Sequence, residues 1–183
     1  MLIVALAIVS PTADRVVSDK PPPRITKTHF AGAKSPATSI RQIKEVTLCL
    51  HNLERADRGL RKLVWNPDLS RVAAEHASDM VSDHYFSHYS SGRRDHMDRI
   101  AASAYRPTTG CWTAGENLFF SAGTSTPRQL MSAWLRSPAH RVNILRNNWR
   151  DFGLGVGTKS PKGDPDGLTI VALFGIRAGH GCG

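Results

Sequence analysis

Residues 168–174 are Leu-Thr-Ile-Val-Ala-Leu-Phe, a run that is apolar on both faces of the strand it predicts. A strand of this kind lies inside a sheet whose two faces are both covered, so helices are expected above and below it. Residues 152–158 form a second strand-like run, and the segment between the two runs is rich in Gly, Pro, Asp and Ser. This composition is typical of turns, so the C-terminal part predicts a hairpin.

The first predicted helix begins near Ser39. Its apolar residues recur at helical spacing, and Gly59 is placed to end the helix in a left-handed conformation. The apolar positions are Ile40, Ile43, Val46, Leu50 and Leu53. Next to them, the amide of Asn52 is expected to brace a neighbouring loop.

The second predicted helix opens at Asn66-Pro67, an N-cap followed by proline in the first helical position, and runs to about Ser82. Its apolar stripe consists of Leu69, Val72, Ala73, His76, Ala77 and Met80. Because His76 belongs to this stripe, it is interpreted as a buried structural histidine with a satisfied ring nitrogen.

Three shorter helices are predicted over residues 95–104, from Thr126-Pro127 onward, and from Ser137-Pro138 onward. The Ser137 hydroxyl is expected to cap the last of these helices by accepting a backbone N–H, which argues against a Ser137–His140 hydrolase pair. Four large aromatic residues are expected in the core, namely Trp134, Trp149, Phe152 and Phe174.

The chain has 183 residues, 40% of them hydrophobic and 21% charged, as expected for one ordinary globular domain. Its net charge of +9 favours anionic partners. The basic residues are scattered, however, and no stretch interleaves them with aromatic residues. Specific nucleic-acid binding is therefore not predicted.

The N-terminal part predicts export. Residues 1–13 contain a short apolar run that suits a signal peptide, and residues 14–39 form a proline-rich spacer without helical or strand periodicity. The folded domain is then expected over residues 40–183. No other segment has the length and apolar character of a transmembrane helix, and the protein is expected to be secreted and monomeric.

The three cysteines, Cys49, Cys111 and Cys182, allow at most one internal disulfide and leave one thiol free, with three pairings open. None of them lies at the short spacing of a zinc site. The sequence around Cys111 matches no cysteine-nucleophile signature.

A set of motifs, in a consistent order from about residue 45 to residue 176, resembles a known family. The motifs are Leu50-His51-Asn52-Leu53-Glu54-Arg55, Leu63-Val64-Trp65-Asn66, Ala73-Ala74-Glu75-His76, Tyr85-Phe86-Ser87-His88, Asp98-Arg99-Ile100, Gly115-Glu116-Asn117-Leu118 and Trp134 to Leu145. They are similar to those of the CAP superfamily, which includes cysteine-rich secretory proteins, antigen 5 and class-one pathogenesis-related proteins, and in particular to its bacterial extracellular branch.

This resemblance implies a secreted α/β protein with a three-layer α-β-α sandwich and a central, mainly antiparallel sheet. It also implies a shallow cleft with two histidines and one or two glutamates that can hold a divalent metal, often zinc. His88 matches the first histidine, Glu116 the glutamate of the Gly-Glu-Asn motif, and His140 the second histidine. The second glutamate of the animal members corresponds to Ser137, so Zn²⁺ or another divalent metal is expected to bind only weakly.

Two functions follow as hypotheses. The preferred one is a non-enzymatic module that binds a cell-envelope component, a lipid or a protein partner. The alternative is a metal-assisted hydrolase in which His88 and His140 hold zinc and Glu116 acts as general base. The histidines at positions 51, 84 and 96 are not expected to take part in catalysis.

Overall fold

The computed structural model describes residues 36–177, with side chains described from residue 40 onward. Its elements are α1 (Pro36–Ala56), β1 (Val64–Trp65), α2 (Pro67–Ser82), α3 (His96–Ala101), β2 (Trp112–Ser121), α4 (Pro127–Arg136), α5 (Pro138–Leu145), β3 (Asp151–Gly157) and β4 (Leu168–Arg177). The predicted signal peptide, the spacer up to residue 35 and Cys182 lie outside the described residues.

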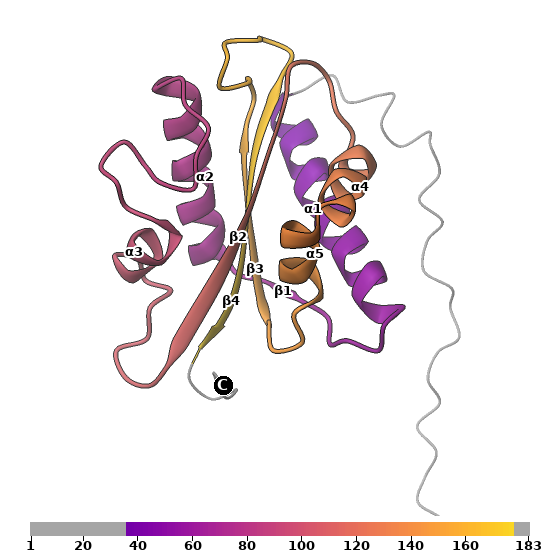
Figure 1. The fold of residues 1–183 in the computed structure, drawn as a ribbon, viewed down its shortest axis with the longest axis vertical. Helices are drawn as coiled ribbons and strands as arrows, with labels where there is room; N and C mark the ends of the chain where they lie inside the picture. Colours follow the sequence, from indigo (N-terminus) through magenta and orange to yellow (C-terminus); the bar gives the residue numbers. More distant parts are fainter. Residues whose placement is uncertain (1–35, 178–183) are drawn as a thin grey trace, which may run out of the picture. The chain divides into compact units, whose positions relative to one another are not determined.

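One mixed sheet forms the middle layer, with the strand order β1-β3-β4-β2. β4 is antiparallel to both β3 and β2, whereas β1 is parallel to β3. Figure 1 shows α2 and α3 on one face of this sheet and α1, α4 and α5 on the other. The predicted α/β class, the mainly antiparallel sheet, the hairpin and the central position of residues 168–174 are all confirmed.

The first helix starts three residues earlier than predicted, at Pro36, where a proline suits the first helical turn because the N–H it lacks would have no partner there. Gly59 has a φ of 66° and turns the chain after the helix, as expected. Asn52 forms two hydrogen bonds with the backbone of Leu63, one to its carbonyl and one from its N–H, and so braces the loop before β1.

The second helix matches its prediction. The Asn66 side chain accepts hydrogen bonds from the N–H groups of Asp68 and Leu69, and the predicted apolar stripe is buried along the whole helix. This stripe packs on the sheet. The four aromatic residues expected in the core are also buried, but on the opposite face of the sheet.

The capping prediction for Ser137 was wrong in its chemistry. Ser137 occupies the N-cap position of α5, but its hydroxyl accepts no capping hydrogen bond. Thr126, by contrast, forms a complete capping box with Gln129 at the start of α4. Because α5 follows α4 directly, Ser137 is also the residue that ends α4, and its own N–H is bonded to the Trp134 carbonyl.

The sequence pattern does not predict strand β2. Its middle residues, Gly115, Glu116 and Asn117, are poor strand formers, yet β2 pairs with β4 over ten residues. It lies at one edge of the sheet, and two of its carbonyl groups are covered from the helical layer. Asn143 donates to the Glu116 carbonyl and the Trp134 indole to the Leu118 carbonyl, so that stretch of edge cannot pair with another strand.

Cys111 is disulfide-bonded and Cys49 is an exposed free cysteine on α1. Over the part of the chain that the structure describes, no helix is long and apolar enough to cross a membrane.

Candidate functional site

The site is built around Glu116, whose side chain is only 1% exposed. In a strand, every second side chain points to the same face, and Glu116 therefore shares the face of Ala114 and Leu118, toward α2 and α3. A carboxylate buried here would be costly if it were unpaired. Both of its oxygens have partners: Oε1 lies 2.8 Å from His88 Nδ1, and Oε2 lies 2.6 Å from Arg99 Nη2.

Arg99 holds two parts of the site at once. While Nη2 donates to Glu116, Nη1 donates to the backbone carbonyls of His88, at 3.0 Å, and Arg94, at 2.8 Å. α3 presents this side chain, and a capping box formed by Asp95 and Asp98 fixes the start of the helix. One guanidinium group thus ties the strand that carries Glu116 to the loop that carries His88.

The charge on Glu116 is determined by these neighbours. Burial alone would raise its pKa, but the hydrogen bond from His88 and the positive charge of Arg99 outweigh burial. The pKa of Glu116 consequently lies below its ordinary value. The group is an ionised carboxylate that accepts two hydrogen bonds.

His88 reaches the surface, with 51% of its side chain exposed. Because a carboxylate can only accept, the proton on the His88 ring is assigned to Nδ1, which donates to Glu116. In the neutral ring, the lone pair then belongs to Nε2. His88 therefore offers solvent a ring nitrogen that can accept a hydrogen bond or bind a metal ion.

A second histidine, His76, forms a hydrogen bond with the loop that carries His88. His76 is completely buried on α2, and its Nε2 lies 3.0 Å from the Ser87 carbonyl. The Tyr85 hydroxyl lies 3.4 Å from the other ring nitrogen. The predicted structural role with a satisfied ring nitrogen is confirmed.

His140 comes to the site from the opposite helical layer. Its backbone carbonyl accepts from Asn117 Nδ2 at 3.0 Å, and Asn143 donates to both the Glu116 carbonyl and the Asn117 side chain. These bonds fasten α5 to the edge of β2. Burial and the nearby His88 both lower the pKa of His140, which favours its neutral form.

The structure thus brings His88 and Glu116 into direct contact and places His140 close enough to His88 for their charges to interact. Residues Arg99, Asn117 and Asn143 complete the arrangement, and sequence analysis gave none of them a role. All three residues lie in the motifs that carry the family resemblance, but nothing near them in the sequence indicates which groups they bond.

A family model described as the cysteine-rich secretory protein family, CAP, matches residues 48–174. The chain is a CAP-domain protein. The match includes His88, Glu116 and His140, and the resemblance inferred from the motifs is confirmed.

Relatives of this CAP domain occur in bacteria. YkwD of Bacillus subtilis (strain 168) is 32% identical over 145 residues, which cover 78% of this chain and 52% of YkwD. The B. subtilis membrane protein YlbC is 31% identical over 126 residues, or 69% of this chain and 34% of YlbC. The chain thus spans about half of the length of YkwD and about a third of the length of YlbC.

Solved structures have the same fold. An extracellular protein containing an SCP domain from Bacillus anthracis matches with a TM-score of 0.61 and 27% identity, over 79% of this chain and 44% of that one. An outer surface protein from Borrelia burgdorferi matches with a TM-score of 0.63 and 20% identity, over 75% of this chain and 94% of that one.

The geometry of this site limits how a metal ion could bind. Within residues 36–177, no three His, Cys, Asp or Glu side chains form a group that could hold a metal ion. Both Glu116 oxygens are engaged, and the Arg99 cation lies beside them. Of the three residues expected to hold a metal, only the imidazoles of His88 and His140 are left as possible ligands, with Glu116 orienting the His88 ring.

Proposed function

We propose that this CAP domain is an extracellular binding module and that the cleft formed by His88, Glu116 and His140 recognises an anionic glycan of the cell envelope. The extracellular location is supported by the B. anthracis relative, which is described as an extracellular protein. The net charge of +9 supports an anionic ligand.

The observation that carries a binding role is the engagement of Glu116. A general base needs a pKa near the working pH and an oxygen that is free to accept a proton. Glu116 has a lowered pKa, and both oxygens accept hydrogen bonds from residues of the chain itself. Its arrangement suits a residue that orients His88 for ligand contact better than one that activates water.

Exposed aromatic side chains beside the cleft favour a glycan as the ligand. Phe86 is 42% exposed and Tyr89 58% exposed, on either side of His88 in the same loop. The Phe86 ring lies 4.8 Å from the half-buried Phe120 ring, and the Lys162 ammonium lies 5.4 Å from the centre of that second ring. Sugar rings stack their C–H faces on such aromatic surfaces, and the lysine would pair with an acidic substituent.

The distance along β2 favours an extended ligand. Phe120 follows Glu116 by four residues on the same face of the strand, so the two positions are separated by about 13 Å. A chain of sugars could contact the cleft and the aromatic shelf, defined as Phe86, Phe120 and Lys162, at the same time.

Sedimentation with purified B. subtilis cell walls tests the proposal. One wall preparation retains its anionic polymers and the other has been stripped of them by acid. We expect the protein to sediment with the intact walls and more weakly as salt is added. Phe86→Ala and His88→Ala should each weaken binding about tenfold, whereas Val64→Ala, an exposed site on the opposite edge of the sheet, should not.

Two outcomes would reject this function. One is failure of the unchanged protein to sediment with either preparation, and the other is binding by Phe86→Ala and His88→Ala that is as tight as that of the unchanged protein. The hydrolase alternative has its own test, in which casein, peptidoglycan and ester substrates are incubated with the protein, with and without zinc. Zinc-dependent turnover that His140→Ala abolishes would favour the enzyme over the binding module.

A further inference from the structure

A cavity lies between α1 and β1, at the edge of the sheet away from Glu116. Its volume is about 420 Å³, within the range of pockets that hold small molecules. Because β1 and β2 are the two edge strands, the cavity and the cleft at Glu116 lie on opposite edges. It therefore belongs to none of the features assigned above.

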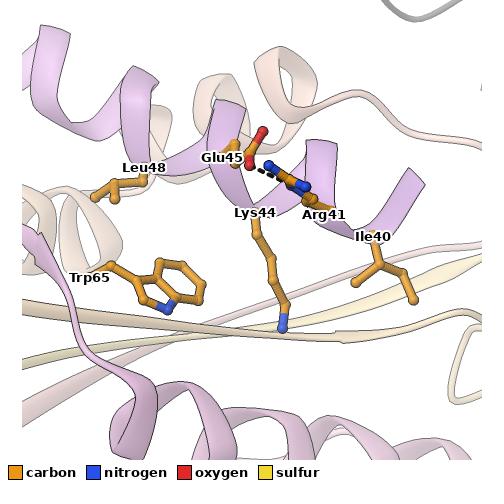
Figure 2. Close-up of a pocket in the computed structure, with 6 residues that line it drawn as sticks. All are labelled: Ile40, Arg41, Lys44, Glu45, Leu48 and Trp65. Atoms are coloured by element: carbon orange, nitrogen blue, oxygen red, sulfur yellow. Dashed lines mark hydrogen bonds and ion pairs between the residues drawn. The ribbon is translucent and has the colours of Figure 1, made fainter. Parts of the chain in front are cut away.

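The walls of this cavity are mainly apolar. Figure 2 shows Ile40 and Leu48 on α1 on either side of the opening, with the indole of Trp65 facing them from β1. The Trp65 ring is held from behind by Phe152, at 6.3 Å between ring centres in an edge-to-face arrangement. Packing against the buried Phe152 ring fixes the Trp65 indole as one wall of this open cavity.

Of the two cations that line this cavity among the described residues, Arg41 is paired with Glu45, and Lys44 extends into the apolar space. Its side chain extends from α1 into the cavity in Figure 2, and its ammonium lies 5.8 Å from the centre of the Trp65 ring. The Lys44 side chain is half-buried, and burial lowers its pKa. Water solvates a half-buried ammonium group only in part, so an anionic partner would stabilise it.

The protein supplies no such partner among the described residues. The acidic side chain in the described lining of the cavity is Glu45, whose Oε1 is paired with Arg41 at 2.8 Å, as the dashed line in Figure 2 shows. The structure gives Lys44 no ion pair or hydrogen bond with any other residue between 36 and 177. Within that range, the face of the Trp65 ring is the one group that contacts the Lys44 charge.

We propose that this cavity binds a small apolar carboxylate, with Lys44 pairing with the carboxylate and Ile40, Leu48 and Trp65 contacting the apolar body. Apolar walls combined with one unpaired cation should favour an apolar carboxylate over a neutral apolar molecule, and should disfavour a cation. This inference is independent of the glycan function proposed for the cleft.

Calorimetric titration of the full chain with two matched probes tests the inference. The probes are 4-phenylbutyrate and its neutral counterpart 4-phenylbutanol, which differ in the carboxylate. We expect the carboxylate to bind with a Kd of about a millimolar or tighter, and at least about tenfold more tightly than the alcohol.

The Lys44→Met variant should lose this tenfold preference and bind both probes alike, because methionine keeps the apolar stem and removes the charge. Lys159→Met, which removes an exposed lysine from the β3–β4 loop, should keep the preference and so controls for the loss of net charge. Melting temperatures of both variants establish that they fold.

Three results would overturn the inference. They are equal binding of the two probes by the unchanged protein, an unchanged preference in Lys44→Met, and no binding of either probe by the full chain.

Discussion

Arg99 and Glu116 form an ion pair in which neither side chain is more than 7% exposed. Removing one partner of such a pair leaves the other as a buried charge without compensation. Arg99→Met should therefore lower the free energy of unfolding by about 3 kcal/mol, measured by urea denaturation. Arg58→Met, which breaks an exposed pair with Glu54, should cost no more than about 0.5 kcal/mol.

The double variant Arg99→Met with Glu116→Gln should recover part of this loss, because it leaves no buried charge behind. A loss below about 1 kcal/mol in Arg99→Met would show that water reaches Glu116 and that Arg99 does not hold the site together.

His51 predicts how stability depends on pH. It is buried against the rings of Trp134, Phe152 and Phe174, and burial lowers its pKa to about 4. The unfolded chain binds this proton near the ordinary pKa of about 6.5, so the stability gained by keeping His51 neutral is complete above that pH. It is lost as pH falls from about 6.5 to about 4, by roughly 3 kcal/mol in total.

His51→Phe removes this titration. Denaturation of both proteins near pH 7 and near pH 4.5 should show a larger loss of stability in the unchanged protein than in the variant. If the two lose the same amount, then His51 is protonated in the folded state at the lower pH and is not enclosed as its contacts indicate.

His88 and His140 predict a weak zinc site. With two imidazole ligands and water, zinc should bind more weakly than in sites with four protein ligands. Titration calorimetry should detect binding near pH 7.5 and a weaker affinity near pH 5.5, because protons compete with the metal for imidazole. His88→Ala should abolish binding, whereas equal affinity in this variant would place zinc elsewhere on the chain.

At the scale of elements, the contact between α2 and β3 depends on the absence of side chains. A Cβ atom on Gly155 would overlap the backbone carbonyl of Ala73, and one on Gly153 would overlap the backbone between Leu69 and Ser70. The helix can therefore lie directly on the strand. This close approach explains why glycine alternates with larger residues in a strand that is buried through most of its length.

Gly155→Ala should destabilise the domain by about 3 kcal/mol, because helix and strand must separate to admit the methyl group. Gly123→Ala is the matched control, since its added Cβ would meet no atom within 4 Å, and it should change stability by less than about 1 kcal/mol. Thermal or urea unfolding measures both. Similar melting temperatures for the two variants would mean that α2 can shift away from β3 at little cost.

At the scale of the whole molecule, the contacts divide the chain into two units, Met1–Ala33 and Lys34–Gly183. Residues 14–39 have no apolar periodicity with which to offset the entropy of ordering, so the spacer is expected to be separable from the domain. Limited proteolysis should leave a stable fragment that begins close to Pro36, where α1 begins.

Mass spectrometry of the protected fragment, together with its melting temperature, checks this expectation. The fragment should melt at the temperature of the full chain. Protection that extends into residues 1–33, or a lower melting temperature after trimming, would show that the N-terminal residues pack on the domain.

The sequence by itself determined the features that depend on near neighbours. Asn66 caps α2 through N–H groups two and three residues away, and the apolar stripe of that helix follows from its spacing. The hairpin was predictable because turn residues separate two apolar runs. The start of α1 was predicted three residues too late, because proline was counted with the spacer although it also suits a first helical turn.

Only the tertiary structure decided how the site is assembled. Glu116 meets Arg99 across 17 residues of sequence and His88 across 28, and its carbonyl meets Asn143 across 27. The resemblance to the CAP family gave roles to three of the residues, but gave none to Arg99, the arginine that neutralises the glutamate. β2 escaped prediction for the same reason, since its polar centre is stable in a strand only because distant side chains supply the charges and hydrogen bonds that burial requires.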